Sequence, residues 1–257
     1  MSVANLSLFA VTNFPEVCPG DDVAAVIIAG LTAMHERLQD GDLVVVAQKI
    51  ISKAENRYVY LDEVSVSDQA QELALTVDKP AALVQLILNE SAAVIRSCPQ
   101  ALIVEHVQGY IHANAGIDHS NLPDVQQDRE RVLLLPEDCN ASAAALREQL
   151  QNHYGVTVST LINDSAGRAW RVGTIGFTLG SAGFQPLLDL VGAQDRYGKT
   201  LKTTQVAIAD ELAAAASFLM GQADEGQPVI IIRGARLPHS KSDAKALLRD
   251  KTQDLFR

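Results

Sequence analysis

The sequence is poor in the residues that mark several common classes of protein. Its 257 residues include three cysteines, Cys18, Cys98 and Cys139, and no pair of them has C-x-x-C spacing. An odd count without that spacing argues against a disulfide framework and against a thiolate zinc site. No apolar run approaches the roughly 20 residues that a membrane-spanning helix needs, and the first residues lack the basic and apolar regions of a signal peptide. We therefore expect a soluble, reduced, cytoplasmic protein.

Basic residues are scarce relative to acidic ones. Lysine and arginine number 21 against 31 aspartates and glutamates, so the formal net charge is −10. Such a chain repels the phosphate backbone of nucleic acids, which makes nucleic acid a poor candidate partner. A polyanionic substrate would instead require metal cations or locally clustered basic residues. Hydrophobic residues make up 47% of the chain, enough for one large domain or two small interlocked ones.

The standard nucleotide-binding motifs are also absent. The segment GAQDRYGKT at 192–200 places five residues between its first glycine and the Gly-Lys pair, whereas a P-loop has four. We expect its Tyr197, Gly198 and Lys199 to form a turn before the next helix. No G-x-G-x-x-G segment follows a predicted strand, so a Rossmann cofactor site is not supported.

Short apolar runs rich in β-branched residues predict the strands. They lie at 8–11, 42–48, 131–136, 156–162 and 228–234. A further hairpin is expected across 101–117, with its turn at Gln108-Gly109. Predicted helices cover 21–38, 79–95 and 203–221. Strands and helices do not alternate regularly, so we predict an α+β fold with mixed sheets and packed helices. The polar interval 118–131 predicts a surface loop or a joint between subdomains.

Two acidic segments follow predicted strands. NAGIDHSN (114–121) gathers Asp118, Asn114 and Asn121 around a glycine turn, and such oxygen donors bind hard cations. An ordinary Asx turn explains the same residues. In NDSAGRAWRVG (163–173) a strand is expected to end at Asp164 and Ser165, with the chain turning at Gly167. Aspartate with a hydroxyl is a common pairing for magnesium, and a solvated turn is the alternative.

Other polar residues are candidates for binding anions or metals. Arg168 and Arg171 can bind a carboxylate or a phosphate through their planar guanidinium groups, or lie on the surface. Lys49 and Lys53 are aligned by one helical turn and can bind phosphates as point charges, although a solvated basic edge is equally consistent. Gln222 follows a predicted helix, where its amide either ligates a metal or has no such role.

These segments, together with their order along the chain, resemble the sequence pattern of a known family. The carrying segments are FPEV followed by GDD, GDLVVVAQKIISKAENR, NAGIDHSN, NDSAGRAWRVGTIGFTLGSAG, DRYGKTL, DELAAAASFLMGQADEGQPVIIIRG and the tail LLRDKTQDLFR. Along nearly its whole length the chain resembles the coenzyme F-420-0 gamma-glutamyl ligase family. The resemblance implies a GTP-dependent enzyme that adds L-glutamate to the lactyl-phosphate deazaflavin precursor. It also implies divalent Mg or Mn ions, often a potassium ion, and an intertwined homodimer of α+β subdomains.

The resemblance also implies roles for particular residues. Metal ligands are expected at Asp118, Asp164, Ser165 and Gln222, and catalytic roles at Asp118, Asp164 and Lys53. From their own chemistry, and not from the resemblance, we also expect Arg168 and Arg171 at the substrate. Nucleotide contacts are expected at Phe14, Pro15, Glu16, Val17, Gln48, Lys49, Lys53, Asn121, Leu219, Met220, Gly221, Gln222, Ala223, Asp224, Glu225 and Gly226.

Some positions depart from the family pattern. Family members usually carry small hydroxyl residues where Gln48 and Lys49 stand, a glycine where Asn56 stands, and a threonine or similar residue where Asn163 stands. The choice between GTP and ATP therefore stays open, as do the number of glutamates and the preferred metal. A ligase for another carboxylate or a modified deazaflavin, a non-catalytic nucleotide-binding protein and a metal-dependent phosphohydrolase are the alternatives. No C-terminal flavin-binding extension is expected.

Overall fold

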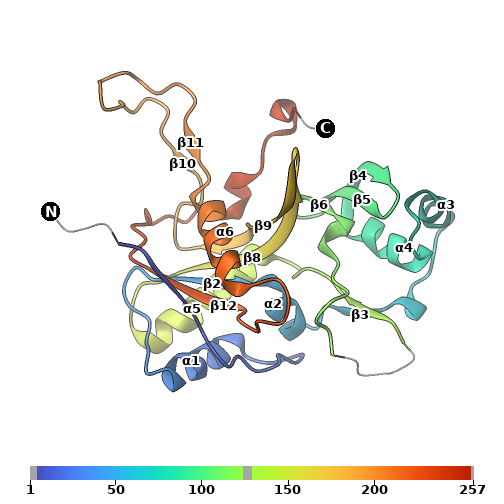
Figure 1. Ribbon diagram of the computed structural model, residues 1–257, viewed down its shortest axis with the longest axis horizontal. Coiled ribbons are helices and arrows are strands. Elements are labelled where there is room, and N and C mark those ends of the chain that lie inside the picture. The colour runs from blue at the N-terminus through green and yellow to red at the C-terminus, as the bar shows by residue number, and fades with distance from the viewer. Residues whose placement is uncertain (1–4, 124–128, 256–257) are drawn as a thin grey trace. The chain divides into compact units, whose positions relative to one another are not determined.

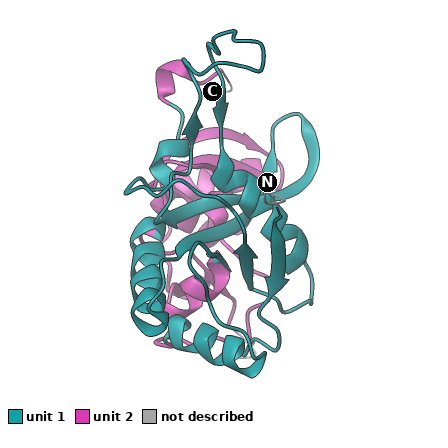
Figure 2. Cartoon of the chain, turned by 90° about the vertical axis from the view of Figure 1, so that its left-hand side faces the viewer, with its two compact units in different colours: residues 1–16, 22–47, 139–249 teal, residues 17–21, 48–138, 250–257 magenta. Residues whose placement is uncertain are grey.

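A computed structural model describes residues 5–123 and 129–255 of the chain and is α+β with mixed sheets, as predicted (Figure 1). The chain divides into two compact units, each assembled from separate stretches of the sequence (Figure 2). Unit 1 comprises 1–16, 22–47 and 139–249, and unit 2 comprises 17–21, 48–138 and 250–257. Each unit has its own hydrophobic core.

Unit 1 is built on a five-stranded sheet in the order β1-β12-β2-β8-β9. Only the β2–β8 pairing is parallel. The elements of unit 1 are β1 (Ser7–Ala10), α1 (Val23–Ala33), β2 (Leu43–Ala47), α5 (Cys139–Tyr154), β8 (Ser159–Arg168), β9 (Arg171–Ala182), β10 (Leu188–Asp189), β11 (Gln205–Val206), α6 (Ile208–Met220), β12 (Val229–Arg233) and the 3-10 helix η3 (Ala244–Leu247).

Helices pack against the two faces of this sheet. Leu161 on β8 and Ile230 on β12 are fully buried in one cluster with Ala213 of α6. The preceding residue of β8, Thr160, points the other way and donates a 2.7 Å hydrogen bond to the Ala143 carbonyl of α5. The alternation of strand side chains thus gives the sheet two buried faces, one for α6 and one for α5.

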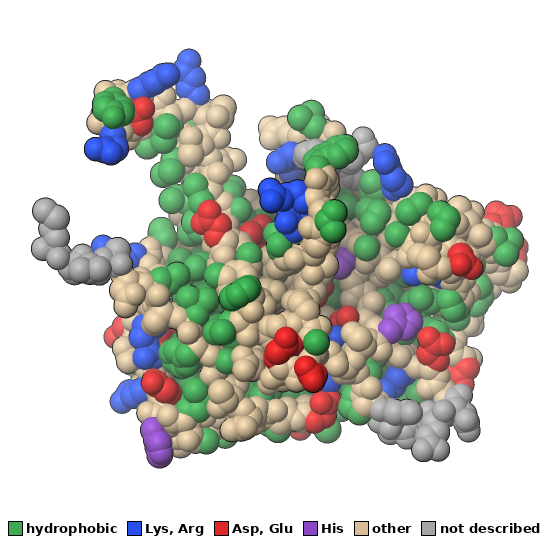
Figure 3. Space-filling view, in the orientation of Figure 1, with side chains coloured by type: hydrophobic (Ala, Val, Ile, Leu, Met, Phe, Trp, Pro, Cys, Tyr) green, Lys and Arg blue, Asp and Glu red, His purple; other side chains and the backbone are tan. Residues whose placement is uncertain are grey.

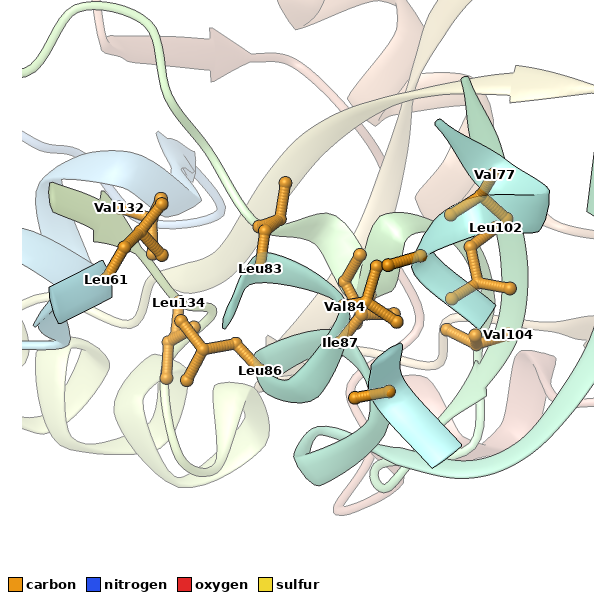
Figure 4. Close-up of a cluster of buried hydrophobic side chains, with 13 residues drawn as sticks. Leu61, Val77, Leu83, Val84, Leu86, Ile87, Leu102, Val104, Val132 and Leu134 are labelled. Carbon is orange, nitrogen blue, oxygen red and sulfur yellow. The ribbon is translucent and has the colours of Figure 1, made fainter. Parts of the chain in front are cut away.

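Unit 2 contains small sheets and short helices around a second core. Its elements are α2 (Gln48–Ala54), β3 (Tyr58–Tyr60), η1 (Leu61–Glu63), α3 (Asp68–Val77), α4 (Ala81–Asn89), β4 (Ser91–Cys98), β5 (Ala101–His106), β6 (Ile111–Ala113), η2 (Asn114–Gly116), β7 (Arg131–Leu133) and η4 (Lys251–Gln253). Strands β4, β5 and β6 form one antiparallel sheet, and β3 pairs with β7. Apolar side chains from α3, α4, β5 and β7 fill the core (Figure 4).

Several predicted boundaries were wrong. The helix expected over 79–95 ends at Asn89, and Ser91 begins β4. The helix expected over 21–38 ends at Ala33, and the strand expected over 131–136 covers only its first three residues. The hairpin over 101–117 is confirmed: β5 and β6 pair across Gly109, whose φ is 102°.

The segment GAQDRYGKT forms no helix N-terminus. It lies in the long connection between β10 and β11, where Gln194 pairs with Thr200 across a turn. This arm of unit 1 exposes basic side chains near its end (Figure 3). The turn at Tyr197 is therefore confirmed, while α6 begins only at Ile208. No helix among the described residues is long and apolar enough to cross a membrane.

Candidate metal and nucleotide site

In unit 2 the candidate residues gather around Asp118. Strand β2 ends at Ala47, and Gln48 begins α2 directly after it. The Gln48 Nε2 atom donates a 2.5 Å hydrogen bond to Asp118 Oδ2, and Gln48 Oε1 accepts a 2.9 Å bond from Ser52 Oγ. Lys49 approaches the other carboxylate oxygen, with Nζ 3.5 Å from Asp118 Oδ1. The structure thus brings together two residues expected at the nucleotide and one expected at a metal.

The backbone around Asp118 is fixed on both sides. Asp118 exchanges two backbone hydrogen bonds with Leu133 of β7, at 2.9 and 3.0 Å. Before it, Asn114, Ala115 and Gly116 all have left-handed φ values between 52° and 69°. A side chain at Gly116 would place its Cβ 2.9 Å from Leu135 Cδ1, so the turn needs glycine there for conformation and for space. The predicted loop therefore presents its carboxylate from a defined turn.

The other residues expected at the nucleotide lie on separate stretches of the chain. Lys53 lies one turn after Lys49 on α2, as predicted, and is 5% exposed. Asn121 follows the loop, is exposed and adopts a left-handed φ of 55°. Val17 is buried in this unit at 2% exposure, whereas Phe14, Pro15 and Glu16 belong to unit 1, in the segment between β1 and α1.

In unit 1 Asp164 and Ser165 lie inside a strand, which corrects the predicted turn. Strand β8 continues past both residues to Arg168, and the chain reverses at 169–170 rather than at Gly167. The continuation is stabilised by pairing with β9, in which Asp164 lies opposite Phe177. Asp164 Oδ1 accepts a 2.7 Å hydrogen bond from the backbone N–H of Ser165.

A close approach between β9 and α6 connects Ser165 to Gln222. Ser165 pairs with Gly176 on β9, so both positions point to the same face of the hairpin. A Cβ atom at Gly176 would lie 2.5 Å from the Ser217 side chain of α6. Ser217 Oγ accepts a 3.1 Å hydrogen bond from Gln222 Nε2. Ser165 and Gln222 thus lie toward the same end of the β8–β9–α6 layer, whereas Asp164, the neighbour of Ser165 on the strand, points to the opposite face.

Asn163 lies at the same junction and was not among the predicted site residues. It is 4% exposed, and its Nδ2 atom lies 3.6 Å from Met220 Sδ. Its Oδ1 atom has no hydrogen-bond partner among the residues that the structure describes. Two signals in the sequence pointed to Asn163: it ends a run of apolar residues, and it departs from the family pattern. Neither signal indicated a ligand as strongly as the carboxylate of the neighbouring Asp164.

The remaining candidates lie at the ends of these elements. Arg168 and Arg171 pair across the end of the β8–β9 hairpin, and Arg168 Nη1 donates to the Gly173 carbonyl at 3.2 Å. The stretch Leu219–Gly226 leaves α6 through Gly221, whose φ is 76°. In that loop the backbone N–H of Ala223 donates to Glu225 and lowers the pKa of the Glu225 carboxyl.

These donors suit a hard cation better than a soft one. Asp118, Asp164, Ser165 and Gln222 offer carboxylate, hydroxyl and amide oxygens, the ligand types that magnesium and manganese bind. Among the described residues no three histidines, cysteines or acidic residues gather as a metal-binding group. A divalent ion bound in either unit would therefore need mixed oxygen donors, bound phosphates or water. The structure is thus that of an α+β protein whose candidate residues carry oxygen donors and basic groups.

Comparison with known proteins gives the family. The model of the F420-0:gamma-glutamyl ligase family matches residues 12–234, and the chain belongs to that family. The coenzyme F420:L-glutamate ligase of Methanothermobacter thermautotrophicus is 43% identical over 254 residues, covering 98% of this chain and 99% of the relative. Proteins with the same name from Methanocaldococcus jannaschii and Archaeoglobus fulgidus are 39% and 35% identical, covering 86% and 98% of this chain and 86% and 96% of those relatives. The predicted family and its enzyme class, a ligase, are confirmed.

Proposed function

We propose that this protein is a ligase that adds L-glutamate to the deazaflavin precursor coenzyme F-420-0 and consumes GTP in doing so. The observation that carries the proposal is the full-length similarity to coenzyme F420:L-glutamate ligases. The grouping of Ser165, Gln222 and Asp164 in one unit, and of Asp118 with Gln48 and Lys49 in the other, supports it. The product is gamma-glutamylated coenzyme F-420.

The metal ligands in this proposal are Asp118 of unit 2 and Asp164, Ser165 and Gln222 of unit 1. Consecutive residues of a strand point to opposite faces, so the side chains of Asp164 and Ser165 do not converge on one point. We therefore assign them to different ions, with Ser165 on the side of Gln222. Two divalent ions, Mg or Mn, follow from this assignment. When bound, they neutralise the triphosphate and the charge that develops during transfer.

The nucleotide contacts are proposed for the segments around the acidic residues. They are Phe14 to Val17, Gln48, Lys49 and Lys53 on α2, Asn121, and Leu219 to Gly226. Lys53 and Lys49 place positive charge near the phosphates. Arg168 and Arg171, at the end of the β8–β9 hairpin, are proposed to orient the carboxylate or phosphate of the acceptor.

The chemistry follows from the poor reactivity of a carboxylate. The acceptor carboxylate attacks the γ-phosphorus of GTP, GDP leaves, and an acyl phosphate forms. The amine of glutamate then attacks the acyl carbon, phosphate departs, and the amine proton passes to solvent. We assign no general base, because positioning of the two reactants supplies a large part of such a rate enhancement.

A coupled assay separates this proposal from its alternatives. Purified protein is incubated with GTP, L-glutamate, Mn²⁺ and the precursor, and GDP is measured with each component omitted in turn. GDP release that requires both glutamate and precursor supports the ligase. Release without glutamate indicates a phosphohydrolase, and nucleotide binding without release indicates a non-catalytic protein. A panel of acceptors, amino acids and ATP then defines the specificity.

The family resemblance also supports a quaternary structure. We propose that units 1 and 2 are the interlocked subdomains of the family and that two chains form an intertwined homodimer. The chain passes repeatedly from one unit to the other, since each comprises three stretches of sequence. Light scattering coupled to gel filtration tests this: a mass of twice 27.6 kDa supports the dimer, and a monomeric mass at all concentrations contradicts it.

A further inference from the structure

The ammonium group of Lys49 lies among oxygen atoms of the Asp118 loop. Its Nζ atom lies 3.0 Å from the Ser120 carbonyl oxygen, 3.5 Å from Ser120 Oγ and 3.5 Å from Asp118 Oδ1. These are a backbone carbonyl, a hydroxyl and a carboxylate. A lysine ammonium carries three N–H donors, so one group can serve all three oxygens.

The surrounding structure keeps this arrangement in place. The side chains of Lys49 and Asp118 are 22% and 26% exposed, so their attraction is screened less than that of a fully exposed pair. Buried Gln48 holds the second carboxylate oxygen of Asp118, and Leu133 holds its backbone. Lys49 itself stands in the first turn of α2, which sets the reach of its side chain.

We propose that Lys49 is a tethered monovalent cation. Carbonyl, hydroxyl and carboxylate oxygens also ligate alkali metal ions, and an ammonium ion is close to a potassium ion in charge and size. A lysine whose ammonium group lies among such oxygen atoms supplies a positive charge permanently, so the protein binds no free ion there. The protein then needs no separate potassium ion at this loop, whereas the family resemblance implies that a potassium ion is often present.

This assignment also defines how Lys49 serves the reaction, and that part rests on the proposed function. Lys49 places a fixed positive charge beside Asp118, next to the proposed metal, rather than moving between partners. The charge keeps the carboxylate oriented and adds to the positive potential that phosphates experience. Of the two lysines proposed to place charge near the phosphates, Lys53, one turn along α2, is then the one that contacts them directly, while Lys49 acts through its fixed charge.

The test compares wild type, Lys49→Ser and Lys49→Met in potassium chloride and in tetramethylammonium chloride at equal ionic strength. Serine leaves space and a hydroxyl for an ion, whereas methionine fills the space without charge. Two quantities are measured: the melting temperature, which needs no substrate, and the rate of GDP release with all substrates. Lys202→Ser, which removes an exposed lysine of the β10–β11 arm, controls for loss of one charge.

We expect wild type to have the same melting temperature and rate in both salts. Lys49→Ser should lose about 10–100-fold in rate in tetramethylammonium chloride, the usual cost of losing a group that supports a metal ligand. Potassium should restore its rate and raise its melting temperature, but should do neither for Lys49→Met.

A wild type that requires potassium, or a Lys49→Ser variant indifferent to the cation, overturns the inference. If wild type releases no GDP in either salt, the proposed function fails, while the melting temperatures still decide the role of Lys49. If the Lys49→Ser variant does not fold, the comparison of wild type in the two salts decides the role of Lys49.

Discussion

Gln48 Nε2 donates a 2.5 Å hydrogen bond to Asp118 Oδ2, and the two residues are 70 positions apart in the sequence. Gln48 is 3% exposed, and its carbonyl oxygen accepts a bond from Ser52 Oγ. An ionised carboxylate only accepts hydrogen bonds, so Asp118 fixes which end of the amide faces it, and the Ser52 hydroxyl donates to the other end. Gln48 is a positioning residue for Asp118, whether or not it also contacts nucleotide.

Replacing Gln48 by leucine should weaken divalent metal binding. The change keeps a side chain of similar length but removes the donor that orients Asp118. We expect about a 10–100-fold loss of Mn²⁺ affinity, since partners of metal ligands have effects of that size. Calorimetric titration and the metal dependence of the rate measure it, and the apparent KM for metal should rise more than kcat falls. Gln205→Leu, which breaks an exposed 3.2 Å bond to Asp189, is the matched control. An unchanged Mn²⁺ affinity would show that Gln48 does not act through Asp118.

Replacing Gly176 by alanine should disturb the contact between β9 and α6. The added Cβ would lie 2.5 Å from the Ala213 carbonyl oxygen and 2.6 Å from Asn163 Oδ1. Overpacking of this kind costs about 1–3 kcal/mol of unfolding free energy, and shifting α6 should also move Gln222 and lower the rate. Denaturant titration measures the first effect. Gly167→Ala, on the same hairpin with open space around it, should leave the unfolding free energy within about 0.5 kcal/mol of wild type. Equal stabilities for the two variants would contradict the close packing.

Replacing Asp164 by asparagine should abolish turnover without unfolding the protein. Asparagine can still accept the hydrogen bond from the Ser165 N–H, so the local strand geometry is kept while the negative charge is lost. Hard metal ions depend on that charge. The measurements are the rate of GDP release and the melting temperature of the same preparation. Turnover at the wild-type rate would remove Asp164 from the metal role.

Glu90 should make the stability of the protein depend on pH. Its Oε2 atom lies 3.6 Å from His106 Nε2 and 3.2 Å from Arg57 Nη2. His106, and then the charge of Arg57, hold the pKa of Glu90 below its usual 4.5, although burial opposes this. Since the pKa is lower in the folded state, the stabilisation is complete above the unfolded pKa and is lost as the pH falls through the folded pKa.

The variant Glu90→Gln isolates this effect. At pH 7 we expect it to lower the unfolding free energy by about 1–3 kcal/mol, because Arg57 keeps a partly buried charge with a weaker partner. The difference from wild type should shrink as the pH falls below 4.5. Denaturant titrations at several pH values measure it. A difference that stays constant from pH 7 down to the acid limit of folding would exclude the ionised carboxylate as its source.

Local sequence was sufficient to predict much of the fold. Asp22 caps α1 by accepting a bond from the Ala25 N–H, and Gly221 ends α6 with a positive φ. The apolar runs of β2 and β12 are buried in the sheet of unit 1, and that of β1 is partly buried beside them. These features depend on neighbouring residues or on the period of the pattern, which the sequence displays directly.

Features that depend on long-range pairing could not be predicted. The alanines after Ser91 suit a helix, but Val94 pairs with Val104 of β5 and the segment becomes a strand. Likewise β8 extends through polar residues because β9 supplies its hydrogen bonds. No local rule distinguishes these outcomes.

The candidate site was predictable to a similar extent. Asp118 and Asp164 became candidates because short polar segments follow apolar runs in the sequence. The contact between Gln48 and Asp118, and the approach of Gly176 to Ser217, join distant parts of the sequence. Side-chain partners of this kind depend on the folded backbone, so only the structure reveals them.

The mass spectrum of the acceptor tests the central claim most directly. The deazaflavin precursor is incubated with purified protein, GTP, Mn²⁺ and isotopically labelled L-glutamate, and the product is analysed intact. The account predicts a mass increase of one or more labelled glutamyl groups, with one GDP released for each bond formed. An unmodified precursor from a folded, metal-loaded preparation would contradict it.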